Sequence, residues 1–407
     1  MRQGSTRRSK YWGKSSTDMK KTVYLDNSAT TEICPEALAK YGYVSQKHFG
    51  NPSSLHAIGF DAEGEIRAAR EIILSSVGGQ KCQLIFTGSG TEANNLAILG
   101  RASAKDRYQR GMKIITTAGE HASVTESVGY LGALGHRVVY LPTRGGAIDF
   151  DTLEKELTED VILVSVMMVN NETGAVYDLP RVAKAVKKHC PDALIHVDAT
   201  QGYMKLPFTM NAIGADMLTV SAHKVEGPKG VGALIVRDEV IKNKGITPII
   251  HGGGQQGGLR SGTENVPAIA AFGEAVRVGM PTLNEDVQYL NSLRALLLER
   301  LSEDALAEIR PTLPPRYAPH ILNLTLPGIK SETMLHYLSS EGIYVSSGSA
   351  CSSNSSHKSG ALLAYGHTER DADCSIRVSF SKRNTPEDVH LLADALASGL
   401  SRLVRIK

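Results

Sequence analysis

The chain has 407 residues, of which 42% are hydrophobic and 21% are charged. This composition is typical of a folded globular protein, and the length favours two domains over a single small core. The formal net charge is +3, but residues 1–21 contain seven basic residues and one acidic residue, so this tail carries +6 and the rest of the chain −3. A slightly acidic body offers no basic stripe for a phosphate backbone, so direct nucleic-acid binding is not expected.

The basic tail, residues 1–21, is predicted to be disordered. Its composition also fits an organellar transit peptide or a leader added before a natural start at Met19, and it lacks the apolar run of a signal peptide. No apolar run in the chain approaches the ~20 residues of a membrane span. Five cysteines without C-x-x-C spacing favour neither a disulfide framework nor a zinc site. No metal is therefore expected, and a reducing cytoplasm is the predicted compartment.

Strand and helix patterns alternate through the first two thirds of the chain. An apolar run at 23–27 precedes a turn cluster at 50–54 and a helical pattern at 58–77. A helix is expected after Gly88, and another after His121 with a candidate Ser123-x-x-Glu126 capping box. Strands are expected at 84–86, 114–115, 138–141, 161–169, 194–197, 217–220 and 231–236. The alternation predicts an α/β fold, with a mainly parallel seven-stranded sheet between helices.

The pattern changes after Gly262, where two long helices are expected at 264–278 and 283–301. A smaller α+β segment follows. Its expected elements are a strand at 321–326, a helix at 332–338, a strand at 376–380 and a last helix that starts at Thr385-Pro386. We therefore predict a large domain over 34–277, and a small α+β domain formed by 22–33 together with 278–407.

Asp198 and Lys224 each follow an apolar run, so both are expected just past strand ends. In an open α/β sheet that edge is where ligands bind, and the two side chains should face one crevice. An amine and a carboxylate in this arrangement suit pyridoxal phosphate. Lys224 would hold the aldehyde as a Schiff base, and Asp198 would keep the pyridine nitrogen protonated. The alternative is that Lys224 is an ordinary solvated surface lysine.

The stretch 88–93, with the pattern G-x-G-x-x-A between a strand and a helix, supports two interpretations. It matches the dinucleotide fingerprint, which would make the protein a nicotinamide-dependent dehydrogenase. Exposed amides at a helix N-terminus bind any phosphate equally well. The dinucleotide interpretation requires an acid at the next strand end, where Glu120 comes late, and it leaves Asp198, Lys224 and Cys351 without roles.

Taken together, the motifs resemble those of group I cysteine desulfurases, fold-type I pyridoxal phosphate enzymes of the class V aminotransferase superfamily. The resemblance runs from about Val23 to the last helix. The matching stretches are 25–27 (LDN), 29–31 (ATT), 50–56 (GNPSSLH), 90–95 (GTEANN), 120–124 (EHASV), 170–174 (NNETG), 198–201 (DATQ), 223–224 (HK), 227–230 (GPKG), 260–263 (RSGT), 347–351 (SGSAC) and 376–379 (IRVS). Ser28 and Gln256-Gly257 depart from the usual pattern.

The resemblance implies roles for individual residues. Lys224, Cys351 and His121 would be catalytic, and His121 would stack on the cofactor ring. Asn27, Asn171 and Arg377 would bind the substrate, with Arg377 pairing with its carboxylate. The residues implied to hold pyridoxal phosphate are Gly90, Thr91, His121, Asn171, Asp198, Gln201, Ser221, His223, Lys224 and Thr263. Taken without the resemblance, His121 could be a histidine that caps a turn, and Arg377 a surface ion-pair residue.

The activity implied by the resemblance is conversion of L-cysteine to L-alanine. The sulfur would leave as a persulfide on Cys351, in the Ser/Gly-rich stretch 346–356, for iron-sulfur cluster assembly or related sulfur transfer. Thr263 would reach the phosphate of a neighbouring subunit, which implies a homodimer. A sulfur-acceptor protein, such as an iron-sulfur scaffold, is the implied partner. A selenocysteine lyase or another class V aminotransferase is the nearer alternative.

Overall fold

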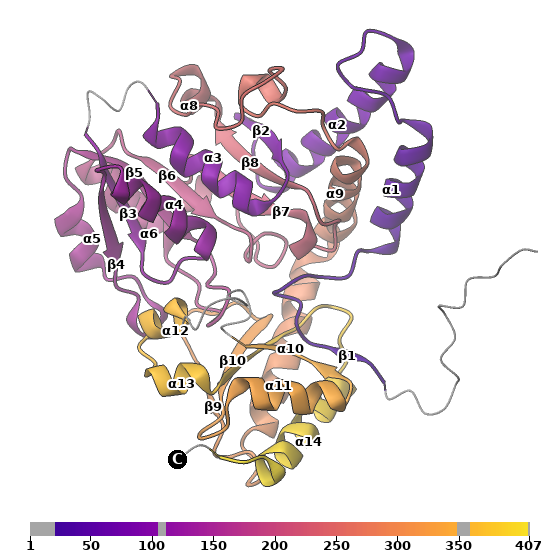
Figure 1. Cartoon of the computed structure of the whole chain (residues 1–407), viewed down its shortest axis with the longest axis vertical. Helices are drawn as coiled ribbons and strands as arrows, with labels where there is room; N and C mark the ends of the chain where they lie inside the picture. The colour runs from indigo at the N-terminus through magenta and orange to yellow at the C-terminus, as the bar shows by residue number, and fades with distance from the viewer. Residues whose placement is uncertain (1–20, 105–110, 348–358, 406–407) are drawn as a thin grey trace, which may run out of the picture.

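A computed structural model describes residues 21–104, 111–347 and 359–405. The predicted tail, except for Lys21, and the persulfide candidate Cys351 lie outside these ranges. Figure 1 shows a larger α/β body above a smaller one, and the N-terminal segment passes from the smaller body to the larger.

The larger body is built on a seven-stranded sheet. β8 (Gly232–Arg237) runs antiparallel to both of its neighbours, and the other strands run parallel. The prediction of a mainly parallel sheet is therefore confirmed, with the strand bounds shifted by a few residues at most. The strand order is β2 (Cys82–Thr87), β8, β7 (Met217–Ser221), β6 (Leu194–Asp198), β5 (Val161–Met167), β3 (Lys113–Thr117) and β4 (Arg137–Leu141).

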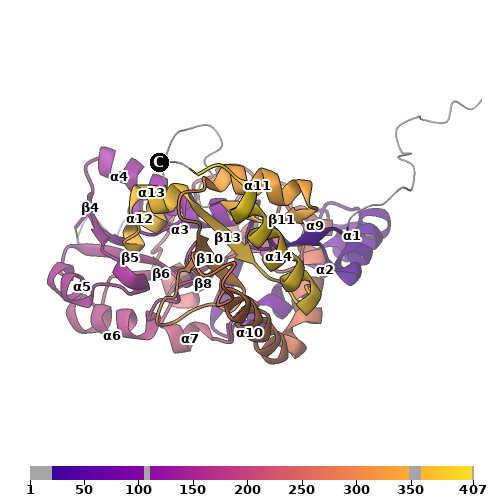
Figure 2. The same cartoon turned by 90° about the horizontal axis from the view of Figure 1, so that it is seen from below.

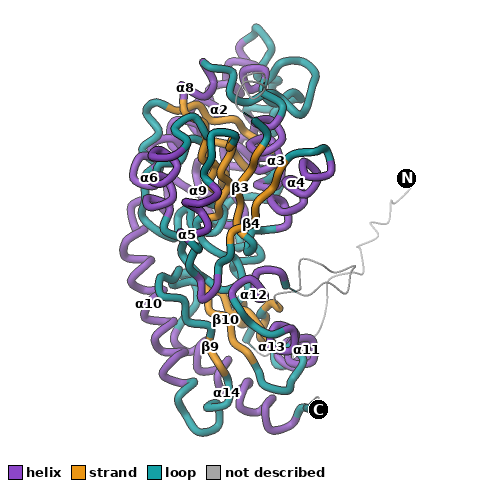
Figure 3. The backbone as a smooth tube through the Cα atoms, turned by 90° about the vertical axis from the view of Figure 1, so that its left-hand side faces the viewer, coloured by secondary structure: helices purple, strands orange, loops and turns teal. Residues whose placement is uncertain are grey.

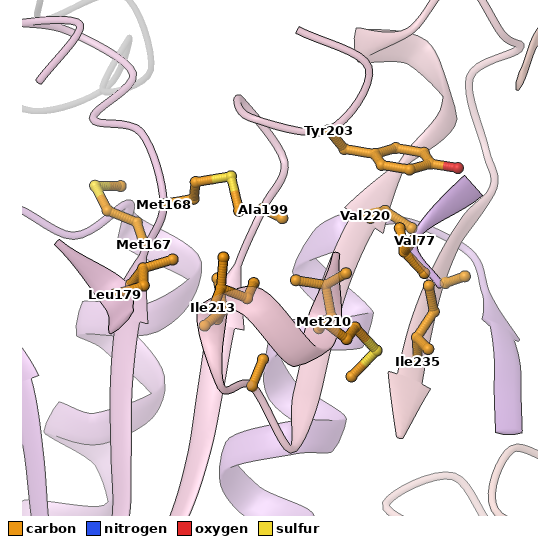
Figure 4. Packing of buried hydrophobic residues seen from close by; sticks show 14 of the residues in the cluster. Val77, Met167, Met168, Leu179, Ala199, Tyr203, Met210, Ile213, Val220 and Ile235 are labelled. Carbon is orange, nitrogen blue, oxygen red and sulfur yellow. The ribbon is translucent and has the colours of Figure 1, made fainter. Parts of the chain in front are cut away.

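Helices cover both faces of this sheet because its central strands are apolar on both sides. All seven residues of β5 are buried. On one face α3 (Gly90–Ala102) and α4 (Ala122–Ala133) pack on side chains such as Ile85. On the other face α2 (Ala57–Ser76), α6 (Leu179–His189) and α9 (Val266–Gly279) pack on the alternate side chains. Figure 4 shows part of that second core, with Met210, Ile213 and Leu179 among its buried side chains.

The smaller body has a four-stranded antiparallel sheet, in the order β12 (Ser346–Ser347), β13 (Ser375–Ser379), β10 (Ile321–Thr325) and β9 (Arg310–Pro311). Its separate core is closed by α10 (Leu283–Arg300), α11 (Ser331–Ser340) and α14 (Pro386–Arg402). These helices surround the sheet when the molecule is seen from below (Figure 2), and α10 runs down its side (Figure 3).

The N-terminal strand β1 (Val23–Tyr24) belongs to the smaller body. It pairs in parallel with β11 (Ile343–Tyr344), and Val23 and Leu25 are buried in the core of that body. The remaining helices are α1 (Pro35–Lys47), α5 (Phe150–Glu156), α7 (Met210–Ile213), α8 (Asp238–Lys242), α12 (Gly360–Tyr365) and α13 (Glu369–Asp373).

The observed starts of α14 and α4 can be compared with the N-caps predicted for them. Thr385 caps α14 in a capping box with Asp388, and Pro386 is the first helical residue, as predicted. The capping box predicted at Ser123 is wrong. α4 begins at Ala122, two residues earlier than a cap at Ser123 would place it, and its N-cap is His121, whose ring nitrogen accepts a hydrogen bond from the Ser123 backbone N–H. A histidine can cap a helix through a neutral ring nitrogen, and the sequence pattern for caps does not include it.

Candidate active site

A cavity of ≈ 270 Å³ lies at the carboxyl ends of the parallel strands, where it also meets Arg377 of the smaller sheet. Asp198 ends β6 and Lys224 follows β7, and both face one crevice as predicted. Ser221, the last residue of β7, and His121, which follows β3, face the same crevice. Of the residues assigned from the sequence, those that line the cavity are Gly90, Thr91, His121, Asn171, Asp198, Gln201, Ser221, His223, Lys224 and Arg377.

The N-terminus of α3 forms one wall. Ser89 caps this helix by accepting a hydrogen bond from the Glu92 N–H, and the amides of the first turn have no acceptor within the helix. A Cβ on Gly90 would lie 3.3 Å from the Ser221 Cβ, and a Cβ on Gly232 of β8 would lie 2.6 Å from the Ser89 carbonyl carbon. Two glycines therefore let the helix start approach the sheet, and the sequence analysis assigned no role to Gly232.

A buried hydroxyl faces the same wall. Ser221 is 2% exposed, and its Oγ has no hydrogen-bond partner among the residues described. A buried hydroxyl without a partner is costly unless a ligand satisfies it. Together with the free amides and the partial positive charge at the start of α3, it fits a phosphate group.

Asp198 is held on both carboxylate oxygens. Its Oδ2 accepts a hydrogen bond from Asn94 Nδ2 at 2.8 Å, and its Oδ1 accepts one from the Thr200 N–H at 2.9 Å. The side chain is only 5% exposed. A buried carboxylate in this fixed orientation fits the protonated ring nitrogen of pyridoxal phosphate.

His121 combines two roles that the sequence analysis treated as alternatives, because it caps α4 and also lines the cavity. Its Nδ1 accepts a hydrogen bond from the Ser123 N–H at 3.1 Å and lies 2.9 Å from Ser123 Oγ. Burial lowers the pKa of the imidazole. The ring is therefore neutral near pH 7, and because Nδ1 is an acceptor, the proton is on Nε2.

Lys224 reaches into the cavity from the turn after β7. Its Nζ donates hydrogen bonds to the carbonyl of Ala29, at 2.8 Å, and to the carbonyl of Ser28. Gln201 Nε2 donates to the same Ser28 carbonyl at 2.9 Å. The N-terminal segment therefore supplies the acceptors that orient both side chains. Lys224 is half-buried, and these contacts hold its Nζ at the cavity.

His223, next to Lys224, is held by Thr30 of the same segment, with 3.2 Å between His223 Nδ1 and Thr30 Oγ1. Burial, followed by the charges of Lys224 and Lys229, lowers the pKa of His223 to about 4. The ring is therefore neutral, and it can offer a hydrogen bond to an anion without a charge of its own.

Arg377 lies on β13 and is 4% exposed. Its Nη1 donates to the Asn171 carbonyl at 2.8 Å, and its Nη2 forms an ion pair with Asp26 Oδ1 at 3.0 Å. Burial raises the pKa of Asp26, although Arg377 opposes this shift. Arg377 is thus an ion-pair residue, but a buried one, and its Nε has no partner in the described part of the chain. That N–H remains for an anionic ligand.

Two residues assigned from the sequence, Asn27 and Thr263, are not among the described residues that line the cavity. The Asn27 amide donates instead to the Ser379 carbonyl at 2.9 Å. Thr263 is exposed in the loop before α9. Cys351 is outside the described ranges. Of the residues that flank its segment, Ser347 pairs with Ile376 beside Arg377, and Ser359 donates a hydrogen bond to Glu172 beside Asn171.

The sequence analysis also missed residues that support the site. Asn94 and Ser123 stand inside the quoted motifs, but only the tertiary contacts reveal their roles. Glu120 is another: its Oε1 accepts hydrogen bonds from Thr117 Oγ1 at 2.6 Å and from the Met167 N–H at 3.0 Å. Burial raises the pKa of Glu120 to about 8, so the carboxyl is mostly protonated at neutral pH.

Known proteins resemble this chain over nearly its whole length. The family described as aminotransferase class-V matches residues 23–392. The cysteine desulfurase IscS of Dictyoglomus turgidum is 37% identical over 387 residues, which cover 95% of this chain and 96% of the relative. A mitosomal cysteine desulfurase of Trachipleistophora hominis is 36% identical, with 94% and 86% of the two chains covered. A solved structure of a NifS-like protein has a TM-score of 0.86 at 35% identity and covers 94% of this chain and 100% of that one.

The fold and the cavity together define a fold-type I pyridoxal phosphate enzyme. The chain belongs to the class V aminotransferase family and, within it, to the cysteine desulfurases. The cofactor is therefore pyridoxal phosphate, and the residues of the cavity fit it. The dinucleotide interpretation of 88–93 is wrong, because a glycine-containing turn before a helix binds phosphate in either setting and the matched family uses a different cofactor.

Proposed function

We propose that this protein converts L-cysteine to L-alanine and passes the sulfur, as a persulfide on Cys351, to iron-sulfur cluster assembly or a related sulfur-transfer process. The observation that carries the proposal is the placement of Lys224 and Asp198 in one cavity beside the start of α3. The names of relatives that cover the same length of chain support the substrate.

The residues of the large sheet would hold the cofactor. The amides of Gly90 and Thr91 and the Ser221 hydroxyl would bind its phosphate, with His223 beside them, and Asp198 would bind its ring nitrogen. Gln201 would hydrogen-bond its phenolic oxygen. When bound, pyridoxal phosphate supplies a ring that accepts electrons from the substrate Cα.

Lys224 would bond to the aldehyde carbon and, once displaced by substrate, move the Cα proton. The two carbonyls of Ser28 and Ala29 fix its Nζ at the mouth of the cavity. Because a carbonyl can only accept a hydrogen bond, Nζ is the donor in both contacts, and together they orient the amine. Held in this position, the amine would take the Cα proton from the substrate and later return a proton.

Arg377 and Asn171 would orient the substrate. The Nε of Arg377 is buried without a partner among the described atoms, and a substrate carboxylate would satisfy it. The contacts with Asp26 and with the Asn171 carbonyl keep the guanidinium plane from rotating. The Cys351 thiolate would then attack the substrate sulfur, so that an S–S bond forms as the Cβ–S bond breaks. The carbon skeleton would keep the electron pair of the broken bond, take up a proton and leave as alanine.

The test compares Cys351→Ala with Cys374→Ser. Cys374 is 1% exposed in the smaller body, and burial raises the pKa of its thiol, so it is a matched cysteine with no expected role. We expect Cys351→Ala to bind the cofactor but to lose alanine and sulfide production, whereas Cys374→Ser remains active. Alanine and sulfide formed by Cys351→Ala at the parent rate would contradict the persulfide route. A selenocysteine lyase or an aminotransferase would then be the better assignment.

A homodimer is the proposed assembly, with Thr263 completing the phosphate site of the partner. Thr263 is exposed, and large apolar side chains are exposed on and between α1 and α2, namely Leu38, Phe49, Leu55, Ile58 and Phe60. Such a cluster marks an interaction surface. Mixing Lys224→Ala chains with Thr263→Ala chains should restore part of the activity, because one of the two sites in the heterodimer receives both intact residues. Parent-level activity from a monomer would disprove this arrangement.

The proposed domain division is 34–277 for the large domain, and 22–33 with 278–407 for the small one. The separate core of the smaller body supports it, and Ala318 and Ile321 of the small segment pack against a core of the large one. The proposed sulfur acceptor is a protein such as an iron-sulfur scaffold, and the proposed compartment is the cytoplasm. Within the described ranges, no helix has both the length and the apolar character needed to span a membrane.

A further inference from the structure

One buried amide connects two sides of the proposed cofactor site. Asn94 lies in the second turn of α3 and is 1% exposed. Its Nδ2 is 2.8 Å from Asp198 Oδ2 and 2.8 Å from Ser123 Oγ. A carboxamide nitrogen carries two hydrogens, so it can donate one to each oxygen at the same time.

The hydrogen bond from Asn94 to Ser123 determines which partner the Ser123 hydroxyl can donate to. Because Ser123 Oγ accepts from Asn94, its own hydrogen is available to His121 Nδ1, which lies 2.9 Å away. The Ser123 N–H donates to the same Nδ1 at 3.1 Å. Two donors then point at one ring nitrogen, which must be unprotonated. The ring proton of His121 is therefore on Nε2, the nitrogen that does not face Ser123.

We propose that Asn94 is a positioning residue that sets the orientation of the Asp198 carboxylate and, through the Ser123 hydroxyl, reinforces the His121 tautomer that the Ser123 N–H selects. The inference rests on the proposed function, in which Asp198 binds the ring nitrogen and His121 stacks on the ring. One amide thereby links Asp198, which would bind the ring nitrogen, with His121, which would stack on the ring. Loss of the amide leaves Asp198 Oδ2 without its donor and allows the Ser123 hydroxyl to rotate away from His121.

The test uses two readouts on three variants. Asn94→Leu removes both donated hydrogen bonds at similar volume, and Ser123→Ala removes only the arm that leads to His121. Asn95→Ala is the control, because Asn95 is the neighbouring amide on α3 and donates only to the Thr91 carbonyl of its own helix. The readouts are the dissociation constant of pyridoxal phosphate from the apoprotein and the 15N resonances of the His121 ring, assigned with His121→Gln.

We expect Asn94→Leu to weaken pyridoxal phosphate binding about tenfold, since it removes a hydrogen bond to a buried carboxylate. We also expect it to shift the His121 Nδ1 resonance, because Nδ1 loses the hydroxyl donor while the Ser123 N–H remains. Ser123→Ala should shift the His121 resonances but change the dissociation constant less than about twofold, and Asn95→Ala should change neither.

Unchanged His121 resonances in Asn94→Leu, or weaker cofactor binding in Ser123→Ala than in Asn94→Leu, would overturn the proposal. Failure of the parent protein to bind pyridoxal phosphate would instead count against the proposed function, while the resonances of the apoprotein would still test the link to His121. If Asn94→Leu does not fold, Asn94→Ala takes its place, with the same expected and overturning results.

Discussion

Replacing Glu120 with glutamine should remove a loss of stability that the parent protein suffers as the pH rises. Glu120 is 7% exposed, and its Oε2 has no hydrogen-bond partner within the described structure. Burial, reinforced by the nearby charge of Asp198, raises the pKa of this carboxyl from 4.5 to about 8, although its hydrogen bonds from Thr117 and Met167 oppose the rise. Glutamine keeps the shape of the neutral acid and cannot ionise.

The sign and size of the effect follow from proton binding. Between pH 4.5 and about 8 the folded protein holds the Glu120 proton and the unfolded chain does not, so the free energy of unfolding falls as the pH rises through this window. At about 1.36 kcal/mol per pH unit, the full window corresponds to about 5 kcal/mol. Structural relaxation and water entry reduce the penalty of an ionised buried group, so we expect about 2 to 3 kcal/mol.

The assay is urea unfolding of the apoprotein at pH 5.5 and at pH 8.0, for the parent and for Glu120→Gln. Only the change between the two pH values is compared, because glutamine has its own packing cost at either pH. Glu126→Gln is the matched control, since Glu126 is an exposed acid on α4 close in sequence. Equal losses of unfolding free energy in the parent and in Glu120→Gln would refute the assignment of a buried neutral carboxyl.

Other predictions concern the cavity itself. Borohydride reduction of the cofactor-loaded protein should attach the pyridoxyl group to Lys224, and a peptide map that places it on another lysine would contradict the assignment. Arg377→Lys should raise the KM for L-cysteine about tenfold or more with a smaller change in kcat, because an ammonium cannot keep the contacts with Asp26 and the Asn171 carbonyl while it binds a carboxylate. Gly232→Val should reduce cofactor affinity more than substrate affinity, because its Cβ would collide with the start of α3, and an unchanged dissociation constant would disprove the close approach.

Much of the fold follows from local patterns in the sequence. Apolar runs such as 161–169 predict buried strands because a strand covered on both faces needs no polar residues, and the observed β5 lies within that run. Thr385 and Pro386 predict the start of α14 because capping involves only neighbouring residues. The positions of Asp198 and Lys224 after strands were sufficient to predict a shared crevice, since parallel strands end at one edge of a sheet.

The contacts that make the site specific were decided by the tertiary structure. Asn94 reaches Asp198 and Ser123 across 104 and 29 residues of sequence, and Lys224 reaches the Ser28 carbonyl across 196. Asn27 was assigned to the substrate, but the pairing of its segment with the smaller sheet places its amide on the Ser379 carbonyl. Sequence patterns report the periodicity of one element, whereas these hydrogen bonds depend on how α3, α4 and the N-terminal segment pack over the strand ends. No local propensity encodes that packing, because its free energy comes from burial shared by many distant residues.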